Sequence, residues 1–261
     1  MRMPSLFLSH GAPTLARADS ATARFLDGLG ARLPMPRAIL IASAHYETRQ
    51  VRVSSAAQPA TIHDFGGFPA PLYEIRYPAP GDAALAARVV ERLRAAGIDA
   101  AVDPARGLDH GMWVPLLRMY PRAQLPVVGL SVLAGAGGAS ANHAVGRALE
   151  ALRDEDVLVI GSGGLTHNLR ELDWQAAPGA APVAYAAAFA DWMHARLVAG
   201  DIDALLDWER TAPQARRNHP SPEHLMPLYT ALGAGGARPR ATRLHHAYEM
   251  GALCLDAWRF D

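Results

Sequence analysis

The 261-residue chain has a single cysteine, Cys254, which excludes an internal disulfide and any CxxC zinc or redox motif. It has no excess charge, because 25 acidic residues balance 25 basic ones without a long run of either sign. Nothing therefore favours nucleic acid or an anionic membrane as a partner. No apolar run approaches the roughly 20 residues of a membrane span, and the amino terminus lacks the plan of a signal peptide. We expect a cytoplasmic protein.

Several common catalytic signatures are also missing. The chain has neither HExxH nor GxSxG, which are typical of zinc proteases and α/β-hydrolases. The glycine-rich segment 161–164 follows an expected strand, but Thr166 stands where a dinucleotide-binding loop has its third glycine. Residues 45–47 have the HxE spacing of zinc deaminases, whose PCxxC partner cannot exist here. These four classes are therefore unsupported.

Half of the residues are apolar, and short apolar runs alternate with segments of helical periodicity. This alternation predicts an α/β/α layered fold with a mixed, largely parallel central sheet, in one domain that spans residues 1–261. Residues 49–54 alternate polar and apolar side chains, as expected of an edge or half-exposed strand. Strands are expected at 5–9, 38–44, 49–54, 98–102, 125–132, 157–160, around 244 and from 252 to 258, and helices at 21–33, 83–96, 139–152, 182–199, 201–208 and 221–232.

Three of the buried strands each run into a histidine. His10 follows the first strand, His45 ends the second, and His167 follows the strand of residues 157–160. The carboxyl ends of parallel strands line the ligand crevice of an open α/β sheet, so these three imidazoles should converge. That convergence predicts a metal site.

The position of each remaining histidine in the expected elements indicates whether it belongs to the site. Ser221 and Pro222 predict the start of a helix, which would put His224 in its first turn, where the helix dipole favours the neutral, metal-binding imidazole. His110 lies in an expected strand-to-helix connection. The histidines without such a context are interpreted as structural or solvated, and two stay undecided. The first group is His143, His194, His245 and His246, and the undecided pair is His63 and His219.

A long segment from 62 to 81 is rich in proline and aromatic residues. It is too apolar for a linker and too broken for a regular element, so we expect a loop that covers a pocket. Phe65, Phe68 and Tyr73 could wall an aromatic ring, or they could pack the loop onto the core. Both interpretations stay open.

Six motifs, taken together, resemble one family. They are SHGAP at 9–13, SAHYE at 43–47, TIHDFGGFPAPLYEIRYPAPG at 61–81, GLDHGMWVPL at 107–116, GSGGLTHNL at 161–169 and HPSPEHLMPL at 219–228. Their order and near end-to-end coverage are similar to the DOPA dioxygenase branch of the class III extradiol ring-cleavage dioxygenases.

The resemblance implies an enzyme that opens a catechol ring with O2. It implies that His10, His45 and His224 are metal ligands, and that His167 is either a further ligand or the acid/base residue. His110 would face the substrate. The metal would be non-haem Fe(II) in the active enzyme, and Zn(II) could occupy the same site.

One feature departs from the wider class. Its protocatechuate-type members complete a two-histidine, one-carboxylate triad with glutamate, whereas this chain has Glu223 next to His224. Adjacent residues on a helix point about 100° apart, so only one of the two should reach the metal. The branch motif favours His224. An all-histidine site also suits zinc, which leaves the native metal open.

The substrate expected from the resemblance and from the aromatic loop is DOPA, caffeate or a related small phenolic acid. Arg76 or another basic group near the mouth would pair with its carboxylate, and no motif fixes which. Two other functions are considered. A zinc-dependent hydrolase could use the same histidines, and Memo-type interaction proteins resemble this fold family. Several convergent imidazoles argue against a purely binding role. The sequence leaves the oligomeric state open between monomer and homodimer.

Overall fold

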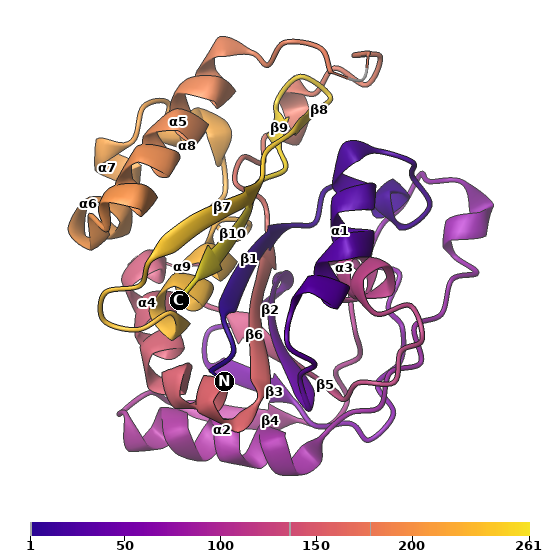
Figure 1. The fold of residues 1–261 in the computed structure, drawn as a ribbon, viewed down its shortest axis with the longest axis vertical. Coiled ribbons are helices and arrows are strands. Elements are labelled where there is room, and N and C mark those ends of the chain that lie inside the picture. The colour runs from indigo at the N-terminus through magenta and orange to yellow at the C-terminus, as the bar shows by residue number, and fades with distance from the viewer. Residues whose placement is uncertain (1, 136, 178) are drawn as a thin grey trace.

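The computed structural model describes residues 2–135, 137–177 and 179–261. Its centre is an eight-stranded sheet with a core of four parallel strands, and antiparallel pairing begins on both sides of that core (Figure 1). The spatial order of the strands is β4 (Ala100–Asp103), β3 (Val51–Ser54), β5 (Val127–Val132), β2 (Ala38–Glu47), β6 (Val157–Gly163), β1 (Ser5–Ser9), β10 (Ala257–Phe260) and β7 (Ala241–His245). The prediction of an α/β fold with a mixed, largely parallel sheet is confirmed.

Both faces of the sheet are covered by helices, because its central strands are apolar on both sides. Alternate side chains of β1 show this: Leu6 and Leu8 pack with α1 (Ala21–Arg32) and α3 (His110–Met119), whereas Phe7 packs toward the opposite layer. In Figure 1, α1 and α3 lie to the right of the sheet, with α4 and α9 to its left. The opposite layer consists of α2 (Ala83–Ala95), α4 (Gly138–Leu149), α5 (Ala184–Ala199) and α9 (Met226–Ala234).

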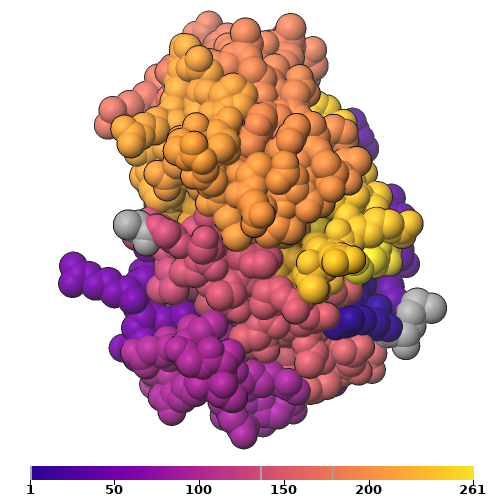
Figure 2. All heavy atoms as spheres, turned by 90° about the vertical axis from the view of Figure 1, so that its left-hand side faces the viewer, coloured from indigo at the N-terminus to yellow at the C-terminus, as the bar shows by residue number. Residues whose placement is uncertain are grey.

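A smaller set of elements extends this second layer beyond the end of the sheet. It contains the short helices α6 (Ile202–Leu206), α7 (Trp208–Thr211) and α8 (Ala215–Asn218), and a hairpin of β8 (Tyr248–Glu249) and β9 (Leu253–Cys254). In Figure 2 the orange helices α5 to α8 form one continuous surface above the layer of α4 and α2. No helix among the described residues is long and apolar enough to cross a membrane.

Several sequence predictions about elements need correction. The strand expected from 252 to 258 is two strands, β9 in the hairpin and β10 in the large sheet. Strand β3 is not at an edge, because β4 pairs with it in parallel and makes the edge itself. The half-exposed alternative fits, since Val51 and Val53 are buried and Arg52 between them is partly exposed. The helix expected from Ser221 begins only at Met226. Pro227 explains the shift: its missing N–H suits the first turn of a helix but would break the ladder of one that began at residue 222.

Candidate metal centre

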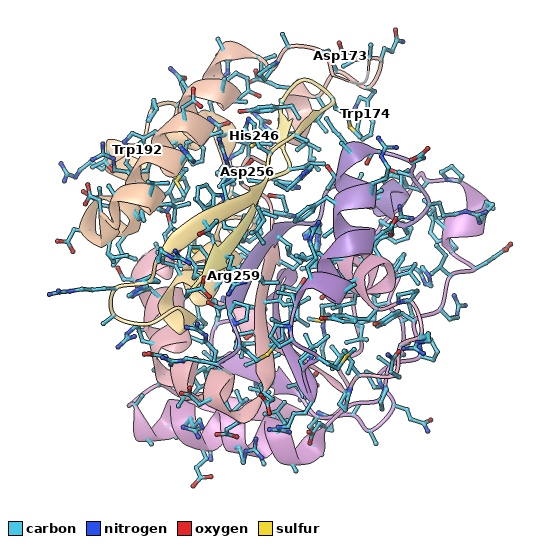
Figure 3. The ribbon with its side chains drawn as sticks, viewed as in Figure 1. Asp173, Trp174, Trp192, His246, Asp256 and Arg259 are labelled. Atoms are coloured by element: carbon cyan, nitrogen blue, oxygen red, sulfur yellow. The ribbon has the colours of Figure 1, made fainter. Side chains whose placement is uncertain are left out.

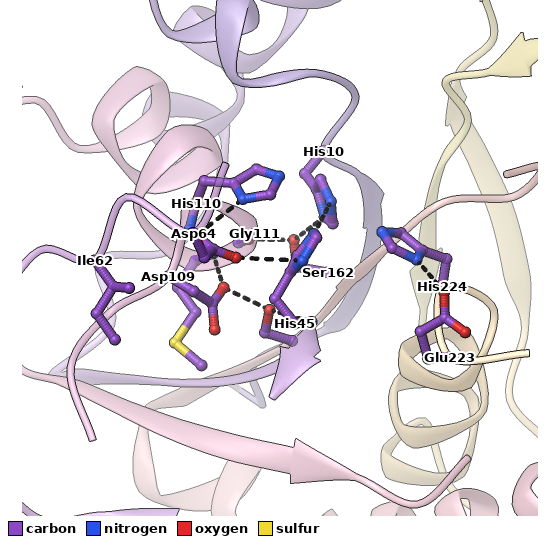
Figure 4. A network of polar contacts seen from close by, with 12 residues as sticks. His10, His45, Ile62, Asp64, Asp109, His110, Gly111, Ser162, Glu223 and His224 are labelled. Carbon is purple, nitrogen blue, oxygen red and sulfur yellow. Dashed lines mark hydrogen bonds and ion pairs between the residues drawn. The ribbon is translucent and has the colours of Figure 1, made fainter. Parts of the chain in front are cut away.

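His10 and His45 lie next to each other at the carboxyl edge of the sheet. His10 directly follows β1, and His45 lies two residues before the end of β2. Both strands pair in parallel with β6, so their carboxyl ends meet at the same edge of the sheet. The Nε2 atoms of the two rings are 3.1 Å apart (Figure 4). Two imidazole nitrogens that each sit about 2.1 Å from one ion can be about this far apart.

His224 approaches from the turn that precedes α9. Its ring centroid lies 4.8 Å from that of His45 and 5.5 Å from that of His10. The backbone N–H of Gly164 donates to the carbonyl of His224, which fixes the turn against the end of β6. A Cβ atom at Gly163 would lie 2.1 Å from that carbonyl oxygen, so only glycine permits this approach. Nε2 of His224 is buried without a hydrogen-bond partner.

In each of these three rings, Nδ1 lies against a hydrogen-bond acceptor. Ser162 donates its hydroxyl hydrogen to the carbonyl of Gly111, so its oxygen accepts from Nδ1 of His10 at 3.1 Å. Asp64 lies 3.3 Å from Nδ1 of His45, and Glu223 lies 2.9 Å from Nδ1 of His224. Acceptors at Nδ1 put the proton there and leave the Nε2 lone pair for a ligand, as metal-binding histidines require.

Asp64 also holds His110, at the first position of α3. One carboxylate oxygen accepts from both the backbone N–H and Nδ1 of His110, at 2.9 and 3.0 Å. Burial by itself would raise the pKa of Asp64, but the hydrogen bonds and charge of His110 lower it to about 2. Asp64 therefore stays ionised, and one carboxylate orients two site imidazoles.

His167 is placed differently from the other site histidines. Its ring stacks on that of His224, with centroids 3.3 Å apart and an angle of 9° between the planes. The ligand atoms of His10 and His45 cluster with that of His110, whereas those of His167 and Glu223 cluster with that of His224. Burial is the main cause that lowers the pKa of His167 to about 3.

The imidazoles of the centre are kept neutral by burial. Burial, and then repulsion from neighbouring imidazoles, lower the pKa values of His10 and His224 well below 6.5. The same two causes lower the pKa of His45 to about 4. Near pH 7 these rings are lone-pair donors, which is the form that binds a metal ion.

A cavity of about 340 Å³ opens onto all five histidines. Phe65 and Phe68 line it, so the loop of residues 62–81 does contribute walls. Tyr73 is not among the lining residues. Arg76 turns back onto its own loop, where it donates to the carbonyls of Tyr73 and Ile75. The structure thus gives no support to Arg76 as the partner of a substrate carboxylate.

The two undecided histidines bond to backbone carbonyls and do not line the cavity. Nε2 of His219 bonds to the carbonyl of Leu165, and Nε2 of His63 bonds to that of Ile75. A second cluster contains His246, Cys254 and Asp256. Asp256 already accepts from the other two side chains and from Trp258, and the Arg243 guanidinium lies 3.9 Å away, so this cluster is a satisfied polar network.

Sequence reasoning did not single out Asp64 or Ser162, and it treated Glu223 only as a rival ligand. Asp64 is 46 residues from His110, and Ser162 is 152 residues from His10. No local pattern links such pairs. The only available signal was that Asp64 and Ser162 lie inside two of the motifs quoted above.

Comparisons with known proteins agree along the whole chain. The model of the family "Catalytic LigB subunit of aromatic ring-opening dioxygenase" matches residues 4–253. A Beta vulgaris protein named 4,5-DOPA dioxygenase extradiol is 40% identical over 260 residues, covering 98% of this chain and 96% of the relative. A protein of that name from Escherichia coli K12 is 40% identical over 261 residues, covering 97% and 93%. A crystal structure of an uncharacterized Escherichia coli K12 protein aligns with a TM-score of 0.83 at 34% identity and full coverage of both chains.

These matches bear out the resemblance that the motifs indicated. They favour ring-opening chemistry over the hydrolase and the Memo-type alternatives, because the family model spans both ends of the histidine cluster, from before His10 to beyond His224. The chain belongs to the family of the catalytic LigB subunit of aromatic ring-opening dioxygenases.

Proposed function

We propose that the chain, as one catalytic domain over residues 1–261, cleaves a substituted catechol outside its diol with O2 at one divalent metal. His10, His45 and His224 would hold the metal. The observation that carries this proposal is the buried Nε2 of His224, which has no partner, on a ring whose centroid lies 4.8 Å from that of His45, whose own Nε2 pairs with that of His10. Fe(II) would serve the active enzyme, and Zn(II) could occupy the same ligands.

A bound metal of this kind would bring the two catechol oxygens and O2 together and let electron density pass between them. The protein supplies the surroundings for this chemistry. Hydrogen-bond acceptors at Nδ1 hold all three ligand rings, and a cavity with apolar walls opens onto them. We expect a cytoplasmic protein, and its oligomeric state stays open between monomer and homodimer.

We assign the proton transfers to the two remaining histidines. Neutral His167 would accept a proton from a catechol hydroxyl, because an anionic oxygen beside the ring raises the pKa of the imidazole. His110 would hydrogen-bond the oxygen substrate or protonate a leaving oxygen. Asp64 supports this role, since its carboxylate accepts from Nδ1 of His110 and so holds the ring in place.

Oxygen uptake and isotope labelling test the proposal. The protein is loaded anaerobically with Fe(II), mixed with a panel of catechols and exposed to labelled O2, and the products are analysed by mass spectrometry. We expect a yellow ring-opened semialdehyde that contains both labelled atoms. A muconate from cleavage between the hydroxyls, or no oxygen uptake with any catechol, would contradict it.

A further inference from the structure

His45 lies where the hydrogen-bond ladder of β2 is interrupted. The register with β5 breaks between Ala42 and Glu47, and the pairing with β6 ends at Ser43. Side chains bond to the two backbone groups of His45 instead. Its N–H donates to Oγ of Ser43 at 3.2 Å, and its carbonyl accepts from Nη2 of Arg106 at 3.0 Å. The backbone that carries this proposed metal ligand is therefore held by two side chains.

Ser43 and Arg106 both bond to the fully buried carboxylate of Asp109. Oγ of Ser43 donates to Oδ1 at 2.7 Å, and Nη2 of Arg106 donates to Oδ2 at 2.5 Å. Nη2 carries two hydrogens, so this one atom can donate to the carbonyl of His45 and to the carboxylate together. The guanidinium also lies 4.4 Å from the ring centre of Tyr46, which fixes its direction.

The same carboxylate begins α3. Asp109 is the N-cap residue of this helix, and its Oδ1 accepts from the backbone N–H of Met112 at 3.2 Å. His110 is the next residue, so the cap also places its backbone. The two elements lie close together, because a Cβ atom at Gly111 would be 3.0 Å from Cδ2 of His45. Asp109 therefore joins the start of α3, which carries His110, to the end of β2, which carries His45.

Two carboxylates thus hold His45 and His110, one at the rings and one at the backbones. Asp64 lies against Nδ1 of both rings, whose centroids are 4.0 Å apart. Asp109 acts on the backbones, through Arg106 and through the helix cap. Neither Arg106 nor Asp109 lines the cavity, so a contribution of this pair to the reaction must pass through the two imidazoles.

We propose that Arg106 and Asp109 are positioning residues that fix His110 relative to the metal ligand His45. This inference rests on the proposed function and deepens it. Without the guanidinium, the carbonyl of His45 loses its donor and the end of β2 is free to move away from α3. A small displacement between a metal and a proton-transfer group is enough to lower turnover by about 10-fold or more.

Four variants test the proposal. Arg106→Lys keeps a cation whose single nitrogen can donate to both acceptors, whereas Arg106→Met keeps an unbranched stem without charge or donor. Asp109→Asn remains a good N-cap but turns its amide hydrogens toward Arg106. The double variant Arg106→Met/Asp109→Asn removes both charges, so it contains no unpaired buried carboxylate.

Activity and stability should separate in these variants. With the catechol that the wild type cleaves fastest, kcat per bound iron should fall by about 10-fold in Arg106→Met, in Asp109→Asn and in the double variant, and stay within about threefold in Arg106→Lys. Urea unfolding of the metal-free proteins should show Arg106→Met as the least stable and the double variant as largely recovered. Recovery of kcat together with stability in the double variant, or unchanged kcat in Arg106→Met, would overturn the inference. If Arg106→Met does not fold, the double variant supplies the same comparison.

The absorption spectrum of the Co(II)-loaded proteins is a readout without turnover. The visible bands of Co(II) depend on the arrangement of its ligands, so they should shift in Arg106→Met and in the double variant but not in Arg106→Lys. Arg259→Met is the matched control, because Arg259 pairs with Asp261 and lies opposite Leu6, near the start of β1, whereas His10 follows the end of that strand (Figure 3). Equal band shifts in Arg259→Met and Arg106→Met would contradict the proposal.

The two readouts separate this inference from the proposed function. Shifted Co(II) bands in the double variant, with no ring cleavage by the wild type, reject the dioxygenase proposal and retain the role of the pair at His45. Ring cleavage by the wild type and the double variant with equal kcat retains the dioxygenase and rejects the positioning pair.

Discussion

Glu223 accepts a hydrogen bond from Nδ1 of His224 across 2.9 Å, although the two side chains are neighbours in the sequence. This contact is possible because both residues lie in the turn before α9 and not in the helix itself. The carboxylate is thus hydrogen-bonded to the histidine. Nε2 of that histidine is buried without a hydrogen-bond partner, so its lone pair can bind a metal ion. The pair acts as a ligand and its support rather than as two rival ligands.

Glu223→Gln should therefore keep the metal. The glutamine amide oxygen can still accept from Nδ1 of His224, so we expect affinity within a fewfold of the wild type, whereas Glu223→Ala should lower it by about 10- to 100-fold. Competition with a chelator measures both. Glu91→Gln, at an exposed residue of α2, is the control. Complete loss of metal in Glu223→Gln would instead make the carboxylate a ligand.

Asp64→Asn should impair metal binding although no ligand is removed. The carboxylate accepts from both His45 and His110, but an amide presents one acceptor and one donor. If its oxygen stays with His110, His45 must move its proton to Nε2, the atom that faces His10. We expect metal affinity to fall by about 10- to 100-fold. Asp191→Asn, at an exposed residue of α5, should bind metal normally. Unchanged affinity in Asp64→Asn would refute the shared-carboxylate account.

His167→Ala and His110→Ala should separate chemistry from metal content. Both variants should keep most of the metal while kcat falls by about 100-fold or more, as loss of a general acid or base does. Metal analysis and oxygen uptake on the same preparation decide the matter. His143→Ala, on α4, is the control. Parallel loss of metal and activity in His167→Ala would identify His167 as a ligand.

The free energy of unfolding of the metal-free protein should fall as the pH drops from about 6.5 to 4. Burial lowers the pKa of His219 to about 4, because its Nδ1 is enclosed without a partner. In that range the imidazole of His219 is protonated in the unfolded chain but neutral in the folded chain, so acid favours unfolding. His219→Gln removes this titration and should reduce the loss by about 3 kcal/mol.

Urea unfolding at stepwise pH values measures this difference. The other buried histidines titrate in both proteins, so only the change between wild type and variant is informative. Above pH 6.5 the imidazole is neutral in both states, and the pH dependence of the two proteins should coincide there. Parallel curves down to pH 4 would contradict the assignment.

Local patterns in the sequence were enough to predict the layered fold and the proximity of His10 and His45. Apolar runs such as 38–44 can be buried only inside a sheet covered on both faces, and the residue after such a strand must emerge at its carboxyl edge. That reasoning places His10 and His45 correctly beside each other. The six motifs, which span most of the chain, indicated the family. These features depend on local pattern, which a sequence displays directly.

How the imidazoles are held follows from packing between distant segments. The bond from His110 to Asp64 joins a helix start to a distant loop, and the stacking of His167 on His224 joins two turns 57 positions apart along the chain. The position of His224 before α9 follows from Pro227 and from the close approach to Gly163. Such contacts depend on packing between segments, because their geometry is fixed by surfaces that no single stretch of sequence contains.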